Sequence, residues 1–108
     1  MIEPGKIKLK IDGVEYDANL DRIANNSDSI IHIDNNTKSL NLISGRDAFC
    51  KFVISSNNSE LVNILRKVNN VEIEGCYRGS TQTMHIEFSD IQTIGSRIIL
   101  TVISTTEQ

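Results

Sequence analysis

The residues with the clearest chemical potential lie in the alternating segment 71–88 of this 108-residue chain. Gly79-Ser80 is typical of a two-residue type II′ turn, and the register that it sets places Glu74 opposite His85 and Glu72 opposite Glu87. Directly opposed side chains have Cβ atoms about 5 Å apart, so three carboxylates and one imidazole would form one patch. These groups suit a divalent cation, but nothing in the spacing specifies a coordination geometry. We therefore favour a solvated polar face in which His85 pairs with Glu74, and we expect no metal site.

Other catalytic or cofactor-binding patterns are not evident in the sequence. The six glycines are scattered and do not have the spacing of a phosphate-binding loop. The two cysteines lack C-x-x-C spacing. Cys50 lies in the apolar segment DAFCKFVI and is predicted to be a core residue, whereas Cys76 is predicted to be partly exposed. We therefore expect a protein that is not an enzyme and that has no cofactor.

The composition favours one small domain built mainly from strands. Ile (17), Val (6) and Thr (7) together supply 30 residues, whereas Ala supplies three. β-Branched side chains lose rotamer freedom in helices and pack well on pleated surfaces. Apolar residues make up 39% of the chain, which is enough for a core. The length fits a single all-β domain covering residues 1–108.

Charge and hydropathy exclude several classes of protein. Eleven Lys and Arg against fourteen Asp and Glu give a net charge of −3, without the basic excess that usually supplies affinity for phosphate. No apolar run approaches the roughly 20 residues that span a bilayer. The first ten residues, MIEPGKIKLK, carry charges where an export signal needs an apolar run. We expect a cytoplasmic location, unless a signal segment precedes the sequence given.

Two hairpins are predicted in the first half of the chain. Asp12-Gly13 is a type I′ turn signal, and its register puts an apolar row on one side and the opposite-charge pairs Lys10–Glu15 and Lys8–Asp17 on the other. A second hairpin joins strands at 29–34 and 37–43 through Asn35-Asn36, with Ile31 opposite Leu40.

One helix is predicted between the strands. Apolar residues of the segment 58–68 recur with a helical period, with Asn57 as the expected N-cap. The segment 47–54 before it and the segment 97–103 near the end are apolar on both faces. A strand of that kind is usually covered on both sides.

From residue 29 the predicted order is strand, strand, strand, helix, strand, strand, which is the order of an OB-fold. The residues that carry this pattern lie on the third strand, the helix, a V-x-I-x-G motif and the closing strand: Cys50, Phe52, Leu61, Leu65, Val71, Ile73, Gly75, Gly79, Ile86, Phe88 and Ile91. In these features the segment 29–94 resembles the tRNA-anticodon-binding-like OB family of small bacterial proteins. Asn69-Asn70 stands where that family has a glycine.

The resemblance implies an OB-like Greek-key β-barrel with a core at 29–94, an extra N-terminal hairpin at 6–20 and an extra C-terminal strand at 97–103. Alternatively, the hairpin is part of a long first strand. In an OB barrel the third and fourth strands are not neighbours, so a disulfide between the two cysteines is not expected.

An OB-fold usually binds along one face of its barrel, and single-stranded nucleic acid is bound by aromatic stacking and cations. The candidate groove residues are Lys38, Arg46, Phe49, Lys51, Tyr77 and Arg78. Because the net charge is −3 and aromatics are few, we favour a non-catalytic binding or interaction module, with a single-stranded nucleic-acid-binding protein as the alternative. A protein partner or self-association is favoured over nucleic acid.

The apolar strand at 97–103 allows two predictions. It is either buried within the monomer, which we favour, or it forms the main surface for self-association.

Overall fold

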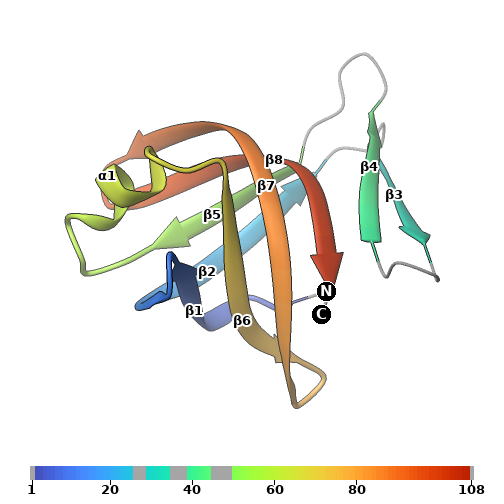
Figure 1. Ribbon diagram of the computed structural model, residues 1–108, viewed down its shortest axis with the longest axis horizontal. Coiled ribbons are helices and arrows are strands. Elements are labelled where there is room, and N and C mark those ends of the chain that lie inside the picture. Colours follow the sequence, from blue (N-terminus) through green and yellow to red (C-terminus); the bar gives the residue numbers. More distant parts are fainter. Residues whose placement is uncertain (1, 26–28, 35–38, 45–49, 108) are drawn as a thin grey trace.

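The computed structural model describes residues 2–25, 29–34, 39–44 and 50–107. The elements are, in chain order, β1 (Gly5–Ile11), β2 (Val14–Asn25), β3 (Ser29–Asp34), β4 (Ser39–Ser44), β5 (Cys50–Ser55), α1 (Leu61–Leu65), β6 (Asn70–Tyr77), β7 (Ser80–Ile94) and β8 (Arg97–Glu107). The strands follow each other in the sheet as β3-β4-β8-β5-β2-β1-β6-β7, and β7 also pairs with β8. Six antiparallel strands thus close into a barrel, and the predicted all-β, OB-like class is confirmed (Figure 1).

The division into core and extra strands is wrong. The barrel consists of β1, β2, β5, β6, β7 and β8, so the hairpin at 6–20 and the strand at 97–103 are barrel strands. The hairpin β3–β4 lies outside the ring, where β4 pairs with the last residues of β8 (Figure 1). β1 and β8 belong to the barrel because both bury side chains in its interior, such as Leu9 and Leu100. The helix still lies between the third and fourth barrel strands, but the ring has six strands where an OB-fold has five.

The first hairpin has the predicted register. Asp12 and Gly13 have φ of 51° and 80°, as a type I′ turn requires. Lys10 pairs with Glu15 and Leu9 with Tyr16. The chain therefore enters β2 with its apolar row facing the core and its charges facing out.

The third hairpin turns one residue earlier than predicted. Its turn residues are Arg78 (φ 49°) and Gly79 (φ 83°), and Tyr77 pairs with Ser80. A type I′ turn suits a right-twisted hairpin, and it needs positive φ at both central positions, which Arg78 adopts here. The partners shift by two residues, so Glu72 faces His85. Because a shift of two preserves the faces, the inward and outward rows remain as predicted.

The register of the second hairpin also differs from the prediction by two residues, in the opposite direction. Ile31 pairs with Leu42 and Ile33 with Leu40, so the predicted pairing of Ile31 with Leu40 is wrong. The pairing ends at Asp34 and Ser39, which makes the connection longer than the two residues predicted. A longer loop shifts the register because loop length sets which residues face each other.

The helix is shorter than predicted. It spans five residues, and Glu60 rather than Asn57 occupies the N-cap position. The Glu60 N–H donates to Asn58 Oδ1 at 2.9 Å, so an Asn-centred turn leads into the helix. Leu61 and Leu65 are fully buried in the barrel core, so the helix is held mainly by packing.

The long β7–β8 hairpin bends at two bulges. The pairing skips Ser89 on β7 and Ile103 on β8, on either side of the Phe88–Val102 pair. Bulges increase the local bend and twist of a strand, so β7 and β8 can each follow the wall of a small barrel. Within the described ranges, no helix has the length and apolar character that crossing a bilayer requires.

Candidate functional site

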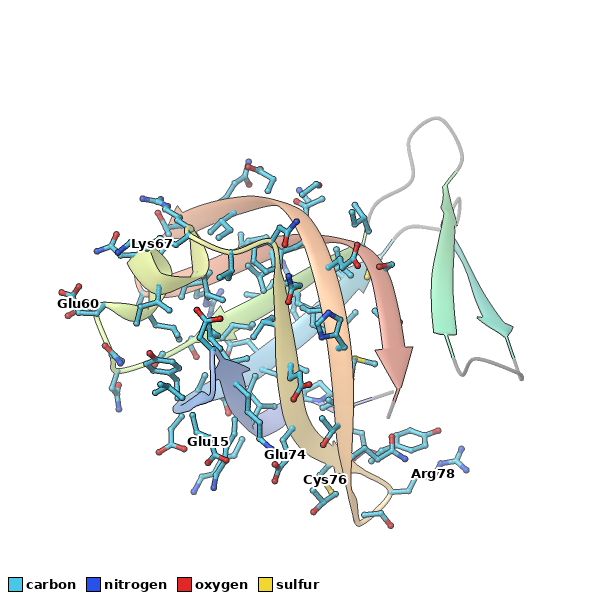
Figure 2. The ribbon with its side chains drawn as sticks, viewed as in Figure 1. Glu15, Glu60, Lys67, Glu74, Cys76 and Arg78 are labelled. Atoms are coloured by element: carbon cyan, nitrogen blue, oxygen red, sulfur yellow. The ribbon has the colours of Figure 1, made fainter. Side chains whose placement is uncertain are left out.

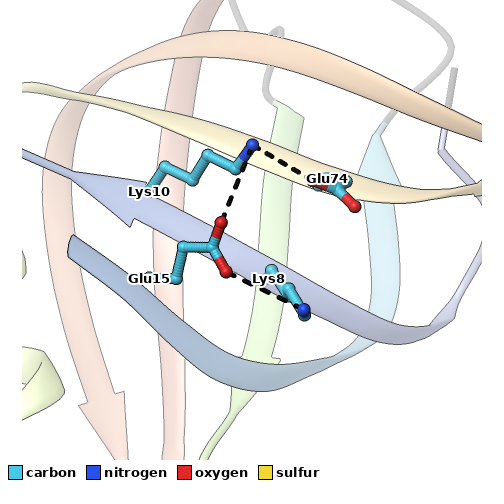
Figure 3. A network of polar contacts seen from close by, with 4 residues as sticks. All are labelled: Lys8, Lys10, Glu15 and Glu74. Carbon is cyan, nitrogen blue, oxygen red and sulfur yellow. Dashed lines mark ion pairs between the residues drawn. The ribbon is translucent and has the colours of Figure 1, made fainter. Parts of the chain in front are cut away.

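The outer side of β1, β2, β6 and the first half of β7 is a polar surface. Lys10 Nζ lies 3.1 Å from Glu74 Oε2 and 4.0 Å from Glu15 Oε1, while Lys8 Nζ lies 3.8 Å from Glu15 Oε2 (Figure 3). The hydrogen bond and charge of Glu74 raise the pKa of Lys10, so this ammonium stays protonated at neutral pH. Exposed pairs of this kind contribute little to stability. These ion pairs place positive side chains beside negative ones across β1, β2 and β6.

This surface does not gather the predicted patch around one imidazole. Glu72 faces His85, but Glu74 faces Thr83 and pairs with Lys10, while Glu87 faces Asn70. The predicted pairings of Glu74 with His85 and of Glu72 with Glu87 are therefore wrong. Among the residues that the structure describes, no group of three or more His, Cys, Asp or Glu side chains is placed to hold a metal ion.

The predicted nucleic-acid groove is divided between opposite sides of the barrel. Lys38, Arg46 and Phe49 lie outside the described residues. Lys51 belongs to β5, whereas Tyr77 is the last residue of β6. Arg78 lies in the turn between β6 and β7 (Figure 2). Two strands separate β5 from β6 in either direction around the ring. The Arg78 guanidinium lies 5.2 Å from the centre of the Tyr77 ring, so these two groups contact each other.

The two cysteines also lie on opposite walls. Cys50 begins β5 and is buried in the core, and its burial raises the pKa of the thiol. Cys76 lies near the end of β6 and is exposed (Figure 2). Both are free thiols, as predicted.

A shallow groove with a volume of about 1290 Å³ crosses the polar surface towards the loop at 55–58. Its volume is larger than that of the enclosed pockets, roughly 300–1,000 Å³, that usually hold small ligands. Ser56 Oγ donates to the Asp17 carbonyl at 3.0 Å and accepts from the Asn58 N–H at 3.1 Å. These polar groups hold the loop against β2, and we assign no ligand to the groove.

A different kind of surface lies on the other side of the barrel. We call it the β5–β8 face: the outward side chains of β5, β8 and the adjoining parts of β2 and β7. In the order β2, β5, β8 and β7 they are Arg22, Ala24, Lys51, Val53, Ser55, Arg97, Ile99, Thr101, Ile103, Asp90, Gln92 and Ile94. Val53 pairs directly with Ile99 across β5 and β8. The centre of this face is therefore apolar, although it points away from the core.

The exposure of these side chains varies across the face. Val53 is only 4% exposed and is therefore buried within the monomer, and Ile99 is half-buried. Ile94 and Ile103 are 66% and 50% exposed. Apart from Val14 at the first hairpin, they are the large apolar side chains that the described part of the chain leaves most exposed. Apolar residues that share one face of a soluble protein often mark an interaction surface.

Cations and an anion lie at the flanks of this apolar centre. Arg22 and Lys51 lie on the β2 and β5 side, and Asp90 lies on the β7 side. Arg97 Nε lies 3.7 Å from Asp21 Oδ2, and Asp21 Oδ1 accepts from Ser55 Oγ at 3.0 Å. Asp21 is the residue that the β2–β5 register skips, so this bulge is tied to the neighbouring strand β5 and, beyond it, to β8.

The two sides of β8 differ in burial, and this difference tests the predictions made for the strand at 97–103. Ile98, Leu100 and Val102 are buried in the monomer, and both edges of β8 are paired, which confirms burial for the inner side. Ile99 and Ile103 on the outer side are not fully buried. The β5–β8 face could therefore be anticipated from the sequence, because the segments 47–54 and 97–103 carry apolar residues on their outward as well as their inward side.

Comparisons of the chain with protein-family models, with curated proteins and with solved structures gave no match.

Proposed function

We propose that the chain is a non-catalytic binding module that docks a protein segment on the β5–β8 face. The observation that supports this is the set of outward apolar side chains on β7 and β8, the half-buried Ile99 and the exposed Ile94 and Ile103. The outward rows of β1, of β6 and of the first halves of β2 and β7 are polar apart from Cys76. Interfaces typically combine an apolar centre with a charged or polar rim, as found here.

The resemblance to OB-folds supports the same face. OB-folds bind their ligands along the second and third strands. In this barrel the second and third strands are β2 and β5, which contribute Arg22 and Val53. The ligand class that fits is an apolar protein segment that carries acidic residues, because the exposed cations Arg22 and Arg97 adjoin the apolar centre.

The alternative is a single-stranded nucleic-acid-binding protein, and the three cations of this face favour it. Such proteins also stack bases on aromatic rings. The described residues of the β5–β8 face include no aromatic side chain. We therefore rank a protein segment above nucleic acid as the ligand.

A random peptide library selected on the immobilised wild-type protein tests the proposal. The variant Ile99→Lys places a charge at the centre of the face without removing a core side chain. The matched control Thr83→Lys places the same charge on the polar surface, where Thr83 pairs with Glu74. Circular dichroism and urea unfolding establish that both variants are folded.

The selected peptides are expected to combine apolar and acidic residues. They should bind wild type and Thr83→Lys alike, and bind Ile99→Lys at least about tenfold more weakly, as loss of a central interface residue would give. Peptides that bind all three proteins equally would overturn the proposal. Anisotropy with short single-stranded DNA and RNA tests the alternative: micromolar binding that falls with salt and is lost in Arg22→Glu would establish nucleic acid as the ligand class.

A further inference from the structure

We draw no further inference here: the strongest candidate, the patch of outward apolar side chains on β7 and β8, belongs to the β5–β8 face already described, and nothing in the structure shows what covers it.

Discussion

Gly75 and Ile2 should behave as one unit in the stability of the barrel. Ile2 is 2% exposed and packs against Gly75 of β6. A Cβ atom built on Gly75 would run into the Ile2 Cγ2 atom and would lie 3.2 Å from the Ile7 Cγ2 atom. The backbone of Gly75 does not have positive φ, so alanine is allowed there by conformation and is opposed by space alone.

The magnitudes follow from that contact. Gly75→Ala should lower the free energy of unfolding by about 1–3 kcal/mol, the usual effect of overpacking. Ile2→Ala should lower it by about 2–4 kcal/mol, because it removes a buried branched side chain. It should also loosen Glu3, whose N–H donates to the Cys76 carbonyl at 2.8 Å and whose Oε1 accepts from the Arg78 N–H at 3.0 Å.

In the double variant the two changes should compensate. With alanine at position 2, the new methyl group of Gly75→Ala occupies the space that was vacated. Replacing glycine also lowers the entropy of the unfolded chain, which is worth about 0.4–1 kcal/mol. We therefore expect the double variant to be no less stable than Ile2→Ala alone, with a coupling energy of about 1–3 kcal/mol.

Urea unfolding of the four proteins, followed by circular dichroism, measures the cycle, provided that their m-values agree. Gly13→Ala is the matched control, because a Cβ there meets nothing within 4 Å and its cost comes from φ of +80°. Its effect should add to that of Ile2→Ala. Costs of Ile2→Ala and Gly75→Ala that add to within about 0.5 kcal/mol would refute the packing argument.

Two further predictions concern the bulge on β2 and the buried thiol. Asp21 Oδ1 accepts from Asn19 Nδ2 at 2.8 Å and from Ser55 Oγ at 3.0 Å, so Asp21→Ala should lower the free energy of unfolding in urea by about 1–3 kcal/mol. Asp21→Asn keeps an acceptor oxygen and should recover part of that loss; equal stability of wild type and Asp21→Ala would contradict this role. Burial raises the pKa of Cys50 above its unfolded value, so the thiol favours the folded state below the unfolded pKa and this contribution is lost as pH rises through the folded pKa. Urea unfolding between pH 7 and about 10.5 should therefore show a decline in wild type that is smaller in Cys50→Ala; parallel curves would count against it.

Local features were predictable where the turn residues and the side-chain patterns of both faces of a hairpin indicate the same register. Asp12-Gly13 fixed both a turn type and a register, and both rows of the hairpin supported that register. At Gly79 two neighbouring dipeptides can form a two-residue turn, and the sequence pattern favours the wrong one. Because the alternatives differ by two residues, both keep Val71 and Ile73 inside. Hydrophobic patterning alone does not distinguish them.

Pairing between distant segments was less predictable. β8 lies beside β5 and β7, and β2 lies beside β1 and β5. No local pattern specifies that residues 97–103 close a ring with residues 50–55. For that reason the OB-like order was assigned to strands beginning at residue 29, although β3 and β4 lie outside the barrel. The predicted groove failed for the same reason. Lys51 and Arg78 can share a groove only if their strands are neighbours, and β5 and β6 are not neighbours.

The apolar pattern of β5 and β8 requires an explanation beyond closure of the barrel. Closure needs only one apolar row on each strand, and Phe52, Ile54, Ile98 and Leu100 supply those rows. β1 meets the same requirement with lysines in its outward row, so the barrel tolerates polar residues on its outer side. Ile99 and the exposed Ile103 are therefore not needed for closure, and exposed apolar side chains on a sheet favour association. Function at this face would account for their presence, and Ile99→Lys separates the two roles, because it changes the outward row and leaves the inward row intact.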